Sequence, residues 1–220
     1  MTRTHSLTQP RLLIAALAIS TALSTLSGCA PLIVGGAMVG GTLMVTDRRT
    51  SGTQIEDQSI ELKALNRIKE VAGDRGHVNV TSYNRMVLIT GEVPTEADKV
   101  AVEQGIARIE NVRSTVNELA VAGSASITSR SNDALLTSKV KASFVDARDM
   151  LSNAFKVVTE RGTVFLMGRV SEREATRASD LARSVSGVQK VVRVFDIVSE
   201  AELAQMTPKS SKAADTPAAK

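Results

Sequence analysis

The chain has 220 residues, of which 27 are Lys or Arg and 23 are Asp or Glu, giving a formal net charge of +4. A single cysteine and two histidines argue against a cysteine- or histidine-based metal cluster and against a nucleophile paired with a histidine base. The paired glycines lie in an apolar stretch, not between a strand and a helix, so no phosphate-binding loop is indicated. We therefore expect no catalytic residue, no metal, no cofactor, no nucleic-acid partner and no enzymatic activity.

The N-terminus has the parts of a secretory signal. Arg3 and Arg11 make a basic beginning, and Leu12–Leu23 is an apolar stretch of about a dozen residues. A membrane-spanning helix needs ~20 apolar residues, so this stretch is too short to span a bilayer. Residues 1–28 are therefore expected to be a signal peptide that is removed.

The run Leu26-Ser27-Gly28-Cys29 resembles the lipobox of bacterial lipoproteins. The resemblance implies cleavage before Cys29, a diacylglyceryl group on its sulfur and acylation of the new N-terminus with a chain such as palmitate. Ala30 stands where an Asp would favour retention in the inner membrane, so the periplasmic face of the outer membrane is implied. Residues 29–46 would then be an apolar, Gly-rich tether. The alternative is an ordinary secreted protein with one unexplained cysteine.

The next segment has the pattern of a small α+β domain. Ile55, Leu62, Leu65 and Ile68 recur at helical spacing, which predicts a helix. Two β-rich runs around a polar turn at Tyr83-Asn84 predict a hairpin. Thr95, just after a proline, can cap a second helix. The expected order is helix, strand, strand, helix, strand, over residues 56–71, 77–82, 85–93, 95–109 and 112–121.

The chain then repeats itself at an offset of 77. The segments Val87–Val93 and Val164–Val170 each hold an apolar run, a glycine, one charge and a valine. The second copy predicts the same order over residues 132–146, 154–160, 163–169, 172–185 and 188–198, with Asn132 or Asp133 capping its first helix. Three glycines are expected to be structural, at places where a side chain would clash or the backbone must turn: Gly91, Gly168 and Gly187.

These patterns predict an α+β fold of two tandem αββαβ domains, each a three-stranded sheet with two helices packed on one face. The first domain spans residues 47–122, the linker 123–131 and the second domain 132–200. Residues 201–220 are expected to be a disordered tail, since they lead into a run rich in Pro, Ala, Ser and Lys. Residues 47–122 hold 10 basic and 12 acidic residues, whereas residues 125–200 hold 12 and 9, so the second domain is the basic one.

The repeat unit resembles the BON domain, and two copies behind a lipobox resemble the dual BON-domain outer-membrane lipoproteins. The most specific stretches are Asp47–Gln54, Thr159–Glu174 and Val185–Val188. The resemblance implies a non-enzymatic protein that supports envelope integrity, gathers at cell-division sites and binds anionic phospholipid, such as phosphatidylglycerol or cardiolipin, through its second BON domain.

In that family the lipid-facing element is the first helix of the second domain, here residues 132–146. The residues it offers for phospholipid binding are Leu135, Lys139, Lys141, Phe144 and Val145, with Arg148 just beyond. Lysines can reach headgroup phosphates, and apolar side chains can enter the headgroup boundary. A competing interpretation places Leu136, Val140 and Phe144 in the domain core, because they share one helix face.

Two other functions remain open. One is an envelope adaptor that docks on a protein partner, such as assembly machinery or a regulator of cell-wall hydrolases. A periplasmic stress protein with holdase-like activity is the third hypothesis. Salt-sensitive vesicle binding would favour the phospholipid hypothesis, because surface electrostatics are screened by salt.

Overall fold

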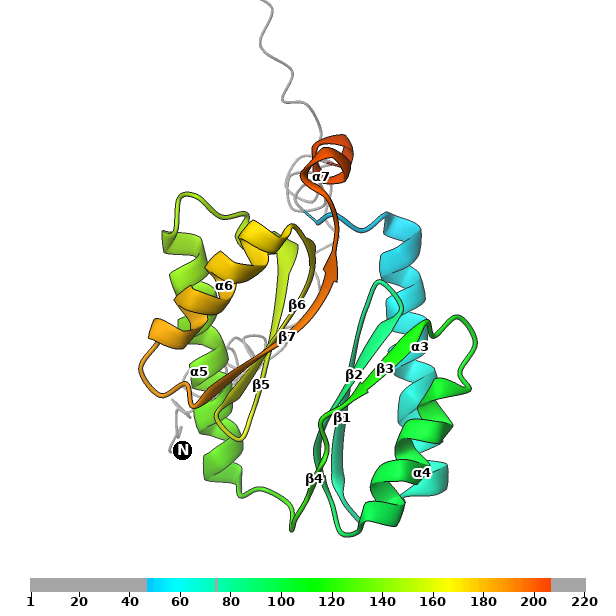
Figure 1. Ribbon diagram of the computed structural model, residues 1–220. Helices are drawn as coiled ribbons and strands as arrows, with labels where there is room; N and C mark the ends of the chain where they lie inside the picture. Colours follow the sequence, from blue (N-terminus) through cyan, green and yellow to red (C-terminus); the bar gives the residue numbers. More distant parts are fainter. Residues whose placement is uncertain (1–46, 74, 207–220) are drawn as a thin grey trace, which may run out of the picture. The chain divides into compact units, whose positions relative to one another are not determined.

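The computed structural model describes residues 47–73 and 75–206. The predicted signal peptide, the tether, Cys29 and residues 207–220 lie outside these ranges. Two αββαβ units follow each other along the chain (Figure 1). The first consists of α3 (Ser51–Val71), β1 (His77–Tyr83), β2 (Met86–Val93), α4 (Glu96–Ala107), β3 (Ser114–Asn117) and a short β4 (Ala120–Val121). The second consists of α5 (Ile127–Asp146), the 3-10 turn η2 (Ser152–Ala154), β5 (Phe155–Glu160), β6 (Thr163–Val170), α6 (Glu172–Ser184), β7 (Lys190–Ile197) and a final α7 (Glu200–Met206).

Each unit has a mixed sheet with its second strand in the centre. β2 pairs antiparallel with β1 and parallel with β3, and β6 does the same with β5 and β7. The two helices of each unit cover one face of its sheet (Figure 1). The predicted α+β fold of two tandem domains is therefore confirmed.

Both hairpins close through tight turns with positive φ angles at both central residues. These residues are Asn84 and Arg85 in the first unit and Arg161 and Gly162 in the second. Such two-residue turns match the right-handed twist of the paired strands. The prediction of a turn at Tyr83-Asn84 was wrong by one residue, because Tyr83 belongs to β1 and pairs with Met86.

Helix α3 begins five residues earlier than predicted and buries a different face, which shares only Ile68 with the predicted stripe. Thr50 caps it by accepting a hydrogen bond from the Thr53 N–H. Its buried positions are Asp57, Ile60, Ala64 and Ile68, whereas Ile55 and the leucines that carried the predicted period are exposed. Two sets of residues along this helix have helical spacing. The set that contains Asp57 and Ala64 is the one that packs against the sheet.

The boundaries of α5 and of the C-terminal tail also differ from the prediction. Helix α5 starts at Ile127, capped by Ser126, so the predicted linker 123–131 ends in helix and Asn132 does not cap it. Residues 200–206 form α7, with Leu203 buried, so the first part of the predicted disordered tail is ordered. The predicted cap of the second helix in the first domain is correct, because Thr95 caps the N-terminus of α4.

The sheet faces not covered by helices pack against each other. Along β2, Val87 and Ile89 point to α3 and α4, whereas Met86 and Leu88 point the other way. Along β6, Phe165 and Met167 alternate in the same manner with core residues. These outward residues join Tyr83 and Val194 in one buried cluster, which we call the inter-sheet core. It makes the two repeats a single packed body with helices α3 and α5 on opposite outer sides.

Candidate membrane-binding face

Helix α5 is held on its sheet by one apolar face. Leu136, Val140 and Phe144 recur four residues apart and are buried in the second domain's core. The Phe144 ring packs edge-to-face on Phe155 with centroids 5.4 Å apart, and Phe155 packs in turn on Phe195. Phe144 is only 1% exposed. Its assignment to the phospholipid-binding set is therefore corrected: it is a core residue, as its helical phase with Leu136 and Val140 requires.

The opposite face of α5 presents apolar and basic side chains together. Leu135 is 56% exposed and Val145 is 69% exposed. Lys139 and Lys141 are both exposed, one on each flank of the buried stripe, and Arg148 is exposed just after the helix. Within the described ranges, none of these three cations forms an ion pair with an acidic side chain. Five of the six predicted residues are thus exposed around the solvent side of α5, which we call the α5 face.

The acidic residues around the α5 face do not neutralise it. The Asp133 carboxylate is buried and accepts hydrogen bonds from the backbone N–H groups of Arg161 and Gly162, each at 2.8 Å. Asp149 is paired with Arg177 at 2.9 Å, and this contact lowers the pKa of the carboxyl group. Asp146 is the one exposed acid within the helix. The face therefore keeps a net positive charge.

A small hollow opens at the C-terminal end of α5. Its volume is about 270 Å³, and it is lined by Lys141, Phe144, Val145, Ser152, Asn153 and Phe155. The aromatic side chains supply apolar walls, and Lys141 supplies a cation. An apolar recess beside a cation suits the region of a lipid where headgroup meets acyl chain.

The three predicted structural glycines occupy tight or turned backbone. Gly91 has φ of +112°, and a Cβ there would collide with the carbonyl oxygen of His77. At Gly168 a Cβ would lie 2.6 Å from the carbonyl oxygen of Ala154. Gly187 has φ of +102° in the turn between α6 and β7. All three positions are geometrically difficult for any residue with a side chain.

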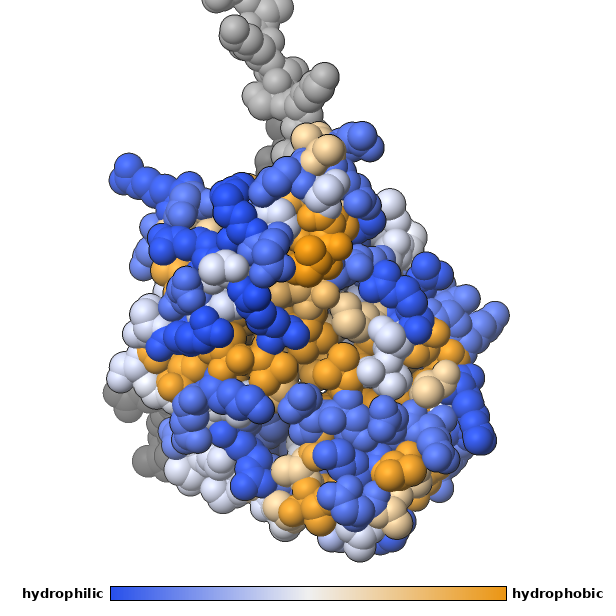
Figure 2. All heavy atoms as spheres, in the orientation of Figure 1, coloured by the Kyte–Doolittle hydropathy of each residue, from blue (hydrophilic) through white to orange (hydrophobic). Residues whose placement is uncertain are grey.

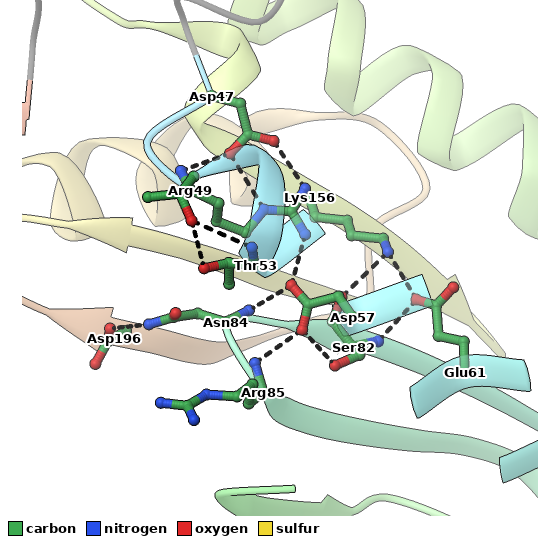
Figure 3. A network of polar contacts seen from close by, with 11 residues as sticks. Asp47, Arg49, Thr53, Asp57, Glu61, Ser82, Asn84, Arg85, Lys156 and Asp196 are labelled. Carbon is green, nitrogen blue, oxygen red and sulfur yellow. Dashed lines mark hydrogen bonds and ion pairs between the residues drawn. The ribbon is translucent and has the colours of Figure 1, made fainter. Parts of the chain in front are cut away.

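Sequence reasoning missed a buried polar network at the hairpin turn of the first domain (Figure 3). The Asp57 carboxylate accepts hydrogen bonds from the Ser82 hydroxyl at 2.6 Å and from the Asn84 and Arg85 N–H groups at 2.8 Å. Arg49 completes the set with an ion pair at 2.9 Å. Asp133 plays the same part in the second domain. Since Asp57 and Asp133 are 76 residues apart, close to the repeat offset, an alignment of the two copies could have shown them.

Two kinds of feature are absent from the described ranges. No helix there is both long enough and apolar enough to cross a bilayer. No group of three or more His, Cys, Asp or Glu side chains there is arranged to hold a metal ion.

Hydrophobic residues also gather along β7 on the face shown in Figure 2. Ile197, at the end of this edge strand, is about half exposed. Basic residues flank it, since Lys190 and Arg193 are exposed as well. Arg193 is engaged by α6, however, through Ser179, Thr176 and Glu172. Arg193 is therefore less available to a ligand than the cations of the α5 face.

Comparison with known proteins places these features in a family. The chain matches the BON domain twice, over residues 56–123 and 132–199. It is 39% identical over 173 residues to the outer membrane lipoprotein DolP of Haemophilus influenzae, covering 77% of this chain and 89% of that protein. It is 30% identical over 154 residues to a 21 kDa hemolysin of Actinobacillus pleuropneumoniae, covering 69% of this chain and 79% of the relative.

Among solved structures, the C-terminal domain of CdsD, from the type III secretion system of Chlamydia trachomatis, is similar with a TM-score of 0.27 and 9% identity. The match covers 61% of this chain and 97% of that chain. A likeness at this level carries no argument about function.

Proposed function

Because this chain belongs to the BON-domain family and is an outer-membrane lipoprotein, we propose that it binds anionic phospholipid through the α5 face of its second BON domain. In this role the protein supports outer-membrane integrity and gathers at division sites, as the family resemblance implies. The proposal is a binding function and assigns no catalytic step.

The observation that carries the proposal is the chemistry of one helix surface. Leu135 and Val145 are exposed beside cations that no acidic side chain in the described ranges neutralises. Each basic residue near an anionic membrane surface contributes ~1 kcal/mol, and exposed apolar side chains add burial in the headgroup boundary. Either contribution alone is weak. A lipid anchor at Cys29 would raise the local concentration of the face at the bilayer, so a weak contact would still be occupied.

Vesicle co-sedimentation tests the proposal. The mature chain with Cys29→Ser, which cannot be lipidated, is mixed with phosphatidylglycerol or cardiolipin vesicles and with zwitterionic vesicles, at low and high salt. We expect binding to the anionic vesicles alone and weaker binding at high salt. The double variant Lys139→Glu/Lys141→Glu should bind at least about 30-fold more weakly, since two contacts of ~1 kcal/mol each are lost.

A matched control lies on the first domain. The variant Arg67→Glu/Lys69→Glu makes the same charge change at the same spacing on the exposed side of α3. It should bind the anionic vesicles as the parent chain does. Equal losses for both double variants would mean that net charge, and not the α5 face, governs binding. No binding of the parent chain to anionic vesicles would overturn the proposal.

A protein-docking role is the second candidate, and a specific surface favours it. Ile55, Leu62 and Leu65 are all exposed on the outer side of α3. Because α3 and α5 lie on opposite outer sides of the inter-sheet core, a molecule with its α5 face on the bilayer turns α3 away from it. Replacing Leu62 with Ser should then abolish crosslinks to an envelope partner and leave vesicle binding unchanged.

A further inference from the structure

The segment Asp47-Arg48-Arg49 stands directly between the tether and α3, and its two arginines contact different domains. Arg48 reaches across to the second domain. Its guanidinium donates to both carboxylate oxygens of Glu174 at 2.8 Å and to the carbonyl oxygen of Arg169 at 3.0 Å. Two parallel bonds to one carboxylate are the strong form of an Arg ion pair.

Arg49 holds the first domain. It forms ion pairs with Asp57 at 2.9 Å and with Asp47 at 2.7 Å. Its guanidinium also lies over the Tyr83 ring, 4.2 Å from the centroid. Tyr83 belongs to the inter-sheet core, so this cation–π contact ties the segment to the surface where the domains meet.

The ion pair between Arg48 and Glu174 is largely buried. The side chains of Arg48 and Glu174 are 5% and 14% exposed. Glu174 also accepts the Ser171 N–H in the capping box of α6. Burial by itself would raise the pKa of Glu174, but the bonds from Arg48 and Ser171 outweigh it and lower the pKa. The carboxylate is therefore charged at neutral pH and bound on both sides.

The pair lies at the end of the second domain where α5 finishes. Glu174 and Arg177 are nearly one turn apart on α6, and Arg177 pairs with Asp149 at 2.9 Å. Asp149 directly follows Arg148 and lies four residues beyond Val145. Two ion pairs on α6 thus hold the start of the described chain and the segment that follows the α5 face.

We infer that Arg48 is a positioning residue, which binds the end of the membrane tether to α6. In this arrangement the α5 face can contact the bilayer that holds the lipid anchor. This inference rests on the proposed function. The 18 residues from Cys29 to Thr46 could reach up to about 60 Å, so their length alone does not orient the second domain. Arg49 holds the adjacent residue to the first domain, and Arg48 adds the contact that fixes the end of the tether to the second domain.

The sequence offers a clean experiment. The chain has no Trp and a single Cys, so Val145→Trp introduces the only tryptophan and Cys29 is the only thiol. The mature chain is coupled through Cys29 to a maleimide lipid in phosphatidylglycerol vesicles that contain brominated phospholipid. Quenching of the fluorescence of the introduced indole then reports insertion of the α5 face. Arg48→Ala and Arg48→Lys are compared with the parent chain, and Arg183→Ala, which loses an exposed ion pair on α6, is the control.

In the parent chain and in Arg183→Ala, each carrying Val145→Trp, we expect strong quenching. In Arg48→Ala the quenching should fall by about half or more, because the effective concentration of the face at the bilayer drops when its orientation is lost. Arg48→Lys, which keeps the charge but not the bidentate bond, should lie between. Without the anchor, as Cys29→Ser, the Arg48→Ala variant should co-sediment with anionic vesicles as the parent does.

The outcomes separate the two claims. Quenching in the parent chain that Arg48→Ala leaves unchanged would overturn the positioning role and keep the lipid-binding proposal. Absence of quenching in the parent chain would overturn both. Circular dichroism melting of each variant excludes unfolding, and equal loss of binding by Arg48→Ala with and without the anchor would show a general structural role and also overturn the inference.

Discussion

At the scale of single residues, the two buried aspartates explain how each hairpin is held against its first helix. Asp57 and Asp133 sit on a helix face that is otherwise apolar, and each carboxylate accepts the N–H groups of a two-residue turn. A buried carboxylate is stable only when its oxygens are bonded. Helical periodicity considers apolar residues alone, so it does not detect such positions.

Replacing Asp57 with Ala should therefore be severely destabilising. The change leaves the turn N–H groups and the Ser82 hydroxyl without their acceptor and leaves Arg49 without one of its two carboxylates. We expect a loss of about 3–5 kcal/mol in the free energy of unfolding. Urea denaturation followed by circular dichroism measures it. Asp180→Ala, which removes an exposed acid, is the control, and a loss below about 1 kcal/mol for Asp57→Ala would contradict this explanation.

At the scale of elements, the two repeats use the same tight turn with different residues. The second position of the turn is Arg85 in the first domain and Gly162 in the second, with φ angles of 64° and 73°. Glycine adopts such angles without cost, whereas other residues do so under strain. The side chain of Arg85 is exposed, so its replacement leaves the buried network in place.

The substitution Arg85→Gly should thus stabilise the first domain. We expect a gain of about 0.5–1 kcal/mol, seen as a higher melting temperature. The reverse change at the matching position, Gly162→Ala, should lower stability, since a Cβ there would meet the Gln189 side chain. A lower melting temperature for Arg85→Gly would show that backbone strain at residue 85 does not limit the stability of the first domain.

At the scale of the whole molecule, the packing of the two sheets decides the architecture. The inter-sheet core is made of residues whose neighbours in the strand belong to the separate domain cores. Polar contacts surround it, including Lys156 with Glu61 at 3.0 Å and Asn84 with Asp196 at 2.8 Å (Figure 3). Since both faces of β2 and β6 are buried, these strands have continuous apolar runs and not alternating ones.

A charge in the inter-sheet core should separate the domains and leave each one folded. Met167 is fully buried there and points away from the core of its own domain. In Met167→Asp we expect thermal unfolding to split from one transition into two, and the radius of gyration from X-ray scattering to increase. Leu151→Asp, at an exposed position, should change neither. A single transition in Met167→Asp would mean that this cluster does not couple the domains.

Features that depend on near neighbours in the chain could be predicted from the sequence. The repeat, the order of strands and helices, the cap at Thr95 and the hairpins follow from spacing, side-chain shape and turn chemistry, which are all local. The membership in the BON family followed from the same repeat and is confirmed. The exposed part of the candidate site, from Leu135 to Arg148, was identified through that resemblance.

Which face of each helix is buried, and which distant residues meet, depends instead on tertiary packing. A helical period fits two stripes of α3 equally well, and only packing selects Ile60 and Ala64 over Leu62. The same selection puts Phe144 in the core while Leu135 and Val145 stay outside. Arg48 and Glu174 are 126 residues apart, and no local rule connects them. Their contact exists because the second sheet presents its uncovered face to the first.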